Sequence, residues 1–144
     1  MIIPACVEFS RASFYTYRRT MKNILKQHHI SFQHAFAGLW WALTTQPNFR
    51  VHIGISIIAL SLCGYLGGSV LEWTIIVFTI TLGLTAEMIN TSLEAMTDLI
   101  TKEWRNEAKI AKDVAAGMML TVAFGAIIVG LLVLGPKLIV RLGF

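Results

Sequence analysis

The chain has 144 residues, of which 56% are hydrophobic and only 14% are charged. Soluble domains carry about 25% charged residues, so this composition excludes an ordinary soluble domain and indicates a small protein that crosses a membrane several times. At this length we expect a single domain. The net charge of +4 comes from basic residues that flank apolar segments, which gives no support to a nucleic-acid partner.

The N-terminal region divides into a tail and an amphipathic segment. Residues 1–20 read as a basic tail that lacks the pattern of a signal peptide. Over residues 21–49, apolar side chains recur at steps of three and four, as on an amphipathic helix. Trp40 and Trp41 are typical of a membrane interface. We therefore expect a helix on the membrane surface that ends at the turn around Pro47.

Three apolar segments are predicted to span the membrane. A Gly-Gly-Ser turn joins the first two, the charged connector 101–113 joins the last two, and Pro136 is predicted to end the third. The expected fold is an all-α membrane protein, with an N-terminal amphipathic surface helix plus three transmembrane helices in one domain over 21–144. The predicted spans are residues 51–66, 70–100 and 114–135.

The distribution of Lys and Arg predicts the orientation. Ten of these residues lie before the first span or in the connector between the second and third spans. Only Lys137 and Arg141 lie on the opposite side, because the turn between the first two spans has none. Cytoplasmic segments are enriched in Lys and Arg, so we expect a multi-pass protein of the inner (plasma) membrane with a cytoplasmic N-terminus and connector.

The second span carries a polar face. At 100° per residue, Glu87, Asn90, Glu94 and Asp98 fall within about 80° of arc on one side of the helix. A carboxylate at bilayer depth costs at least a few kcal/mol on insertion scales, more than a packing contact between helices needs. A polar packing seam is the alternative, but the pattern favours a functional site at the boundary between membrane and cytoplasm.

This polar face and the next helix favour phosphoryl-transfer chemistry. Carboxylates bind Mg²⁺ through one or two ligands and leave the other positions to water and phosphates. Lys112 and Asp113 stand near the start of the third helix, where a lysine and free backbone N–H groups suit phosphate oxygens. Glu87, deeper in the membrane, is the candidate general base toward a lipid hydroxyl. The sequence has no P-loop and no protein-kinase motifs, which excludes those enzyme classes in their usual form.

Two other functions are compatible with intramembrane carboxylates. One is a proton or cation pathway, but the third span has no ionisable residue to continue a relay across the bilayer. The other is a non-catalytic or weakly active assembly subunit whose polar face joins copies of the chain. Small residues of the third span, including Ala115 and Gly125, would allow close helix contacts in such an assembly.

Three motifs resemble one known family, the small prokaryotic integral-membrane diacylglycerol and undecaprenol kinases. They are AFAGLWWALTTQPNFRVH, AEMINTSLEAMTDLI and AKIAKDVAAG, and the resemblance runs from about Phe32 to Lys137. It implies three transmembrane helices per chain, a surface helix and a homotrimer with active sites at subunit contacts. It also implies Mg²⁺-dependent transfer of the ATP γ-phosphate to a lipid hydroxyl, and the motifs are more similar to the undecaprenol branch.

The resemblance also implies roles for the polar face. Glu87 corresponds to the general base of the family, and Glu94 corresponds to the ligand of Mg²⁺ and ATP. Asn90 and Asp98 correspond to supporting residues of the active site.

Four further residues follow from the same resemblance. Lys112 and Asp113 correspond to nucleotide contacts, and His34 falls where the family often has another one. Gln46 stands where the family has a metal-binding glutamate. An amide oxygen still coordinates Mg²⁺ but brings no charge, so we expect Gln46 to be a weaker second metal ligand beside Glu94.

Overall fold

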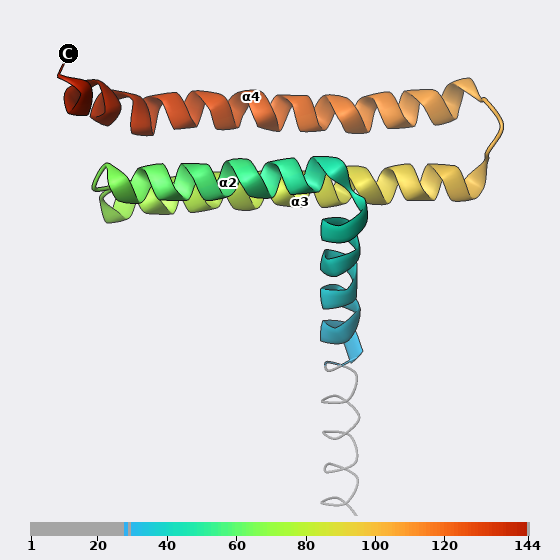
Figure 1. The fold of residues 1–144 in the computed structure, drawn as a ribbon. Helices are drawn as coiled ribbons and strands as arrows, with labels where there is room; N and C mark the ends of the chain where they lie inside the picture. Colours follow the sequence, from blue (N-terminus) through green and yellow to red (C-terminus); the bar gives the residue numbers. More distant parts are fainter. Residues whose placement is uncertain (1–27, 29, 144) are drawn as a thin grey trace, which may run out of the picture. The chain divides into compact units, whose positions relative to one another are not determined.

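The computed structural model describes residue 28 and residues 30–143, and most of this part is helical. Three long helices follow one another: α2 (Pro47–Tyr65), α3 (Val70–Ile100) and α4 (Asn106–Leu142) (Figure 1). No strand occurs in the part of the chain that is described. The predicted tail 1–20 and the start of the predicted surface helix lie outside it.

A separate N-terminal helix covers residues 30–45. Large apolar side chains are exposed along it, among them Phe32, Phe36 and Trp40. Exposed aromatic and apolar side chains are what a helix at a membrane surface presents to the lipid. The helix stops before Gln46, and Pro47 occupies the first turn of α2, where the missing N–H of proline is tolerated. The predicted end of this helix at the turn around Pro47 is therefore confirmed.

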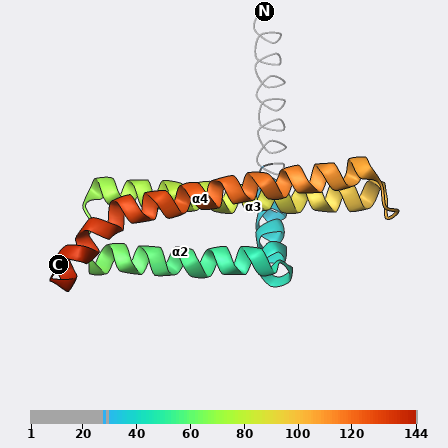
Figure 2. The ribbon, with the colours of Figure 1, turned by 90° about the horizontal axis from the view of Figure 1, so that it is seen from above.

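Helix α3 is the central element of the remaining structure. It packs along α4 on one side and along α2 on another, whereas α2 and α4 touch each other little (Figures 1 and 2). A small core of Cys63, Ile76 and Leu134 joins the three helices. Each helix is long and apolar enough to cross a membrane, and most of its side chains are not buried within the chain. The expected all-α fold with three apolar helices is confirmed.

The turn between α2 and α3 forms as its glycines predict. Gly67 has a φ of +67°, a conformation that favours glycine. A Cβ on Gly68 would lie 2.5 Å from the sulfur of Cys63, so only glycine fits this close approach. Ser69 then caps α3, and its hydroxyl accepts a hydrogen bond from the backbone N–H of Glu72 while the Glu72 carboxylate accepts one from the N–H of Ser69.

Helix α4 is longer than the sequence predicts at both ends. It begins at Asn106, so only residues 101–105 of the predicted connector are non-helical. The prediction that Pro136 ends the helix is wrong, because α4 continues through Pro136 to Leu142 and is capped by Gly143 in the left-handed conformation. Proline removes a single backbone hydrogen bond, and the turns on either side of it hold the helix together.

Lys137 fastens α4 to the turn between α2 and α3. Its Nζ lies 2.9 Å from the Glu72 carboxylate and donates a hydrogen bond of 3.0 Å to the carbonyl oxygen of Gly67. One lysine thereby links the last third of α4 to the turn and to the first turn of α3. On the neighbouring face, the guanidinium of Arg141 lies 5.3 Å from the ring centre of Tyr65, a cation–π distance.

We expect Glu72→Gln to lower the stability of the folded protein. The substitution removes the charge that pairs with Lys137, whereas the glutamine oxygen can still accept the hydrogen bond from the Ser69 N–H. Thermal unfolding in detergent should show a lower midpoint for Glu72→Gln. The matched control is Glu103→Gln, which breaks an exposed ion pair with Arg105 and should leave the midpoint unchanged. Equal midpoints for the two variants would contradict this role of Lys137.

Candidate active site

Three polar residues of α3 lie together on the face that packs against its neighbours. Glu87 and Asn90 are 3% and 5% exposed, an unusual burial for a carboxylate and an amide. The Asn90 side-chain N–H donates a hydrogen bond of 3.0 Å to a carboxylate oxygen of Glu94, one turn further along the helix. The helical spacing in the sequence therefore brings Glu87, Asn90 and Glu94 to one place, as predicted.

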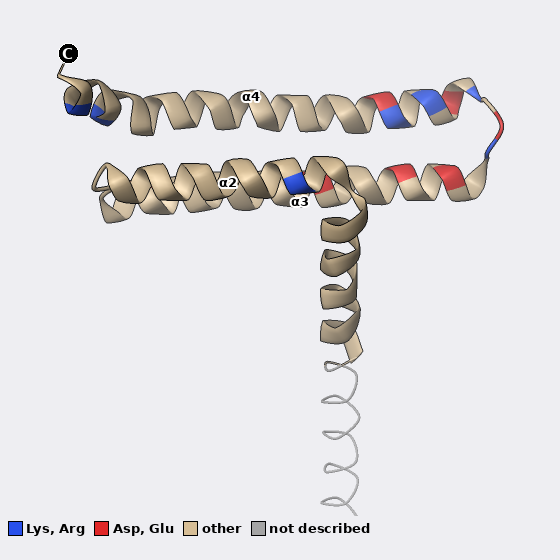
Figure 3. Ribbon diagram, in the orientation of Figure 1, with Lys and Arg blue, Asp and Glu red and all other residues tan. Residues whose placement is uncertain are grey.

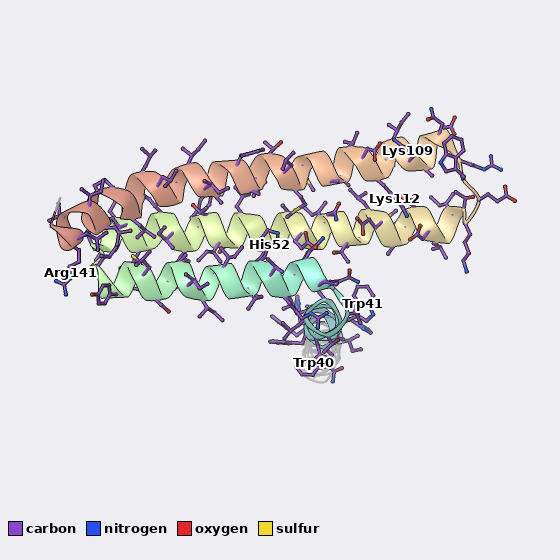
Figure 4. The ribbon with its side chains drawn as sticks, turned by 45° about the horizontal axis from the view of Figure 1, so that its top comes forward. Trp40, Trp41, His52, Lys109, Lys112 and Arg141 are labelled. Carbon is purple, nitrogen blue, oxygen red and sulfur yellow. The ribbon has the colours of Figure 1, made fainter. Side chains whose placement is uncertain are left out.

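These three side chains line an open pocket of about 340 Å³. Helix α2 contributes Asn48 and His52, and α4 contributes mainly apolar side chains. Figure 4 shows His52 between α2 and α3. Polar groups thus come from two helices and apolar walls from the third, an arrangement that suits a ligand with both polar and apolar parts.

One buried side-chain atom of the pocket has no hydrogen-bond partner in the described part of the chain. The side-chain oxygen of Asn90 is buried and accepts no hydrogen bond from any residue in the described part of the chain. A buried carbonyl oxygen without a partner is destabilising, so such atoms are rare in folded proteins. Asn90 therefore holds Glu94 with its N–H and leaves its oxygen for a donor that is not part of this chain's described residues.

Two ion pairs lie beyond the pocket, near the end of α3 and the start of α4. The Nζ of Lys112 lies 2.5 Å from the Asp98 carboxylate, and that of Lys109 lies 2.6 Å from the Asp113 carboxylate. Lys112 points from α4 toward α3 (Figure 4). Asp98 is one helical turn beyond Glu94, so the Lys112–Asp98 pair lies about 6 Å further along the helix axis. Figure 3 shows that charged residues gather toward this end of α3 and α4, whereas the middle of α4 has none.

Five residues named from the sequence do not line the pocket. Asp98 and Lys112 pair with each other beyond it. Asp113 pairs with Lys109 on its own helix. Gln46 is the residue before α2, and its side-chain N–H donates to the hydroxyl of Thr45 at 3.3 Å. His34 is exposed on the N-terminal helix, which forms a separate unit. The roles of these five residues, like those of Glu87, Asn90 and Glu94, stay predictions.

Two pocket residues were not identified from the sequence as site residues. Asn48 and His52 are four residues apart, so they lie on the same face of α2. The signal that could have found them is a pair of polar residues at helical spacing at the start of a segment that is otherwise apolar.

A comparison with known protein families shows which family the chain belongs to. Residues 33–134 match the family model described as "Prokaryotic diacylglycerol kinase". The chain belongs to this family. The match includes all three α3 residues of the pocket, and also Asp98, Lys112 and Asp113.

Three named relatives are similar to between 58% and 81% of the chain. A protein named undecaprenol kinase from Bacillus subtilis (strain 168) is 39% identical over 118 residues, which cover 81% of this chain and 95% of that protein. A protein named diacylglycerol kinase from Synechocystis is 36% identical over 111 residues, covering 76% of this chain and 63% of that protein. A diacylglycerol kinase from Helicobacter pylori (strain ATCC 700392 / 26695) is 31% identical over 83 residues, covering 58% and 65%.

Membership of the prokaryotic diacylglycerol kinase family bears on the functions compatible with the polar face. The relatives are named as kinases that act on lipid alcohols, which favours a lipid kinase among these functions. A proton or cation pathway has no comparable support, because the middle of α4 carries no charged residue (Figure 3).

Proposed function

We propose that this lipid kinase transfers the γ-phosphate of ATP to the hydroxyl of undecaprenol. The observation that carries the proposal is a pocket between the three long apolar helices that is lined by buried Glu87 and Asn90 and by half-buried Glu94. We propose undecaprenol and not diacylglycerol as the substrate because the relative named undecaprenol kinase is similar over 95% of its length.

Glu87 is the proposed general base. It is the most buried carboxylate of the pocket, and it forms no ion pair with any described residue. As the lipid oxygen attacks the γ-phosphorus, its O–H bond breaks and the proton passes to the Glu87 carboxylate. A new P–O bond forms, the bond between the γ-phosphorus and the bridging oxygen breaks, and ADP leaves. Positioning and charge neutralisation carry most of the catalysis in reactions of this kind.

Glu94 is the proposed ligand of Mg²⁺. The described residues contain no cluster of three His, Cys, Asp or Glu side chains suited to a metal. A single carboxylate such as that of Glu94 still fits Mg²⁺, because this ion often binds through one or two carboxylates and takes its other ligands from water and phosphates. Asn90 holds Glu94 in place by its hydrogen bond of 3.0 Å. When bound, the ion would neutralise charge on the phosphates of ATP.

The remaining features follow from the same proposal. The Lys and Arg distribution supports a pocket that opens toward the cytoplasm, where ATP is present, in the inner (plasma) membrane. A homotrimer is proposed from the family resemblance, and the large exposed apolar side chains of α2, α3 and α4 would be shared between lipid and neighbouring copies.

A paired lipid assay tests the proposed function. Purified protein in nanodiscs receives labelled ATP and Mg²⁺ with either undecaprenol or diacylglycerol, and the phosphorylated lipid is measured. We expect faster transfer to undecaprenol. Faster transfer to diacylglycerol would correct the substrate, and no transfer to either alcohol by folded protein would overturn the proposal in favour of a non-catalytic assembly subunit.

Lys112 is expected to contact the phosphates of ATP by exchanging its Asp98 partner for phosphate oxygens. ATP with Mg²⁺ should therefore protect Lys112 from an amine-reactive reagent, as measured by mass spectrometry of the labelled peptides. Lys102, an exposed residue before α4, is the internal control and should be labelled equally with and without ATP. Unchanged labelling of Lys112 at saturating ATP would contradict this contact.

A further inference from the structure

A second cavity continues along the three helices from the pocket lined by Glu87, Asn90 and Glu94, which we call the acidic pocket. This apolar groove has a volume of about 290 Å³ and is lined by residues of α2, α3 and α4, among them Ile55, Ala59, Gly83, Ala126 and Gly130. His52 and Ala123 line both the groove and the acidic pocket, so the two cavities meet at these residues. On α4 the groove extends from Val122 to Leu134, about 18 Å along the helix axis.

The groove offers almost no hydrogen bonds to an occupant. Its polar lining side chains are His52, Ser56 and Thr79. The Ser56 hydroxyl already donates to the carbonyl oxygen of His52 at 2.7 Å, and the Thr79 hydroxyl donates to that of Ile75 at 2.8 Å. The imidazole of His52 forms no hydrogen bond or ion pair with the described residues, so it alone has a full hydrogen-bonding capacity left.

His52 also faces the reacting end of the site. It lines the acidic pocket together with Glu87. Undecaprenol, the proposed substrate, has a single hydroxyl at the end of a long apolar chain. The groove fits the chain, and the junction between the two cavities fits the hydroxyl.

We propose that His52 positions the lipid alcohol: its ring N–H donates a hydrogen bond to the hydroxyl oxygen while the first part of the chain lies in the apolar groove. This inference rests on the proposed function, because it assigns the substrate's place in the same site. The hydroxyl then directs its own hydrogen toward Glu87, and the oxygen keeps a lone pair for the phosphorus. His52 acts by orienting the substrate, and proton removal belongs to Glu87.

Steady-state kinetics of His52→Ala and His52→Gln test the positioning role. Loss of one hydrogen bond should raise KM for the lipid about 3–10-fold in His52→Ala, with KM for ATP unchanged. In His52→Gln, an amide N–H replaces the ring N–H and should recover part of the loss. Equal lipid KM values in wild type and His52→Ala, or a change confined to KM for ATP, would overturn the inference. Absence of transfer by the wild-type protein would instead overturn the proposed function itself.

A pair of glycines on α4 tests the occupant of the groove. Gly130 lines the groove, and nothing lies within 4 Å of a Cβ built there, so Gly130→Leu would fill the space that we assign to the lipid chain. Gly135 also has open space but lies about 140° around the helix from Gly130. We expect Gly130→Leu to raise KM for the lipid several-fold and Gly135→Leu to leave it unchanged. Equal effects of the two variants would contradict a lipid chain in the groove.

Discussion

Replacing Glu87 by glutamine is expected to lower kcat for phosphoryl transfer to a lipid alcohol by about 10²–10⁴-fold, the usual contribution of a general base. Glutamine has nearly the shape of glutamate, so the buried position should still pack while the proton acceptor is lost. The measurement is the rate of phosphorylated lipid formation at saturating ATP and lipid. KM for both substrates should change little, because the proposed role of Glu87 is confined to the reaction step.

The control for this substitution is a glutamate of similar chemistry outside the site. Glu107 is exposed in the first turn of α4, and Glu107→Gln should retain wild-type kcat. If Glu87→Gln kept a tenth or more of the wild-type kcat, Glu87 would not be the base. A shift in KM for ATP with no change in kcat would assign Glu87 to nucleotide binding instead.

Replacing Glu94 by glutamine should have the second large effect. The amide can still accept the hydrogen bond from Asn90, so the geometry of the pocket is kept while the charge toward the metal is removed. We expect kcat/KM for ATP to fall by about 10²-fold, as is typical when one electrostatic contact to the transferring group is lost. The Mg²⁺ concentration that gives half-maximal rate should rise in the same variant.

Titration with Mg²⁺ separates this effect from a general loss of structure. Glu103→Gln changes an exposed glutamate of the connector and should keep the wild-type Mg²⁺ requirement. An unchanged Mg²⁺ requirement in Glu94→Gln would show that Glu94 does not hold the ion. The same titration in Gln46→Glu measures whether a carboxylate at that position strengthens metal binding, as the predicted role of Gln46 requires.

Much of the fold follows from periodicity and composition. The Gly-Gly-Ser turn, the break before Pro47 and the bounds of α3 agree with the sequence because each depends on local rules: backbone freedom, helix caps and apolar length. The extent of α4 does not follow, because Pro136 usually ends a helix. Here the helix persists through it, and Lys137 directly after the proline is anchored to Gly67 and Glu72, which are distant in sequence.

The positions of the site residues on one helix can be predicted from the sequence, whereas their contacts with other helices cannot. The angular positions of Glu87, Asn90 and Glu94 come from the helical repeat alone, and the structure brings them together as expected. The partner of Lys112 depends on how α3 packs along α4, and this cross-helix pair with Asp98 has no signature in the sequence. His52 was missed for the same reason, since its place at the junction of two cavities depends on three helices.

The two ion pairs that join α3 to α4 set a fixed length. Asp98–Lys112 and Glu72–Lys137 are 26 residues apart on α3 and 25 apart on α4, which is about 39 and 38 Å of helix. A bilayer measures about 40–45 Å including its headgroups, so the pairs would stand near opposite faces of the membrane. While ATP is absent, both pairs oppose sliding of α3 past α4 when bilayer thickness changes. The three long helices should therefore adapt to thinner membranes by tilting together, which keeps the pocket around Glu87 intact across lipids of different length.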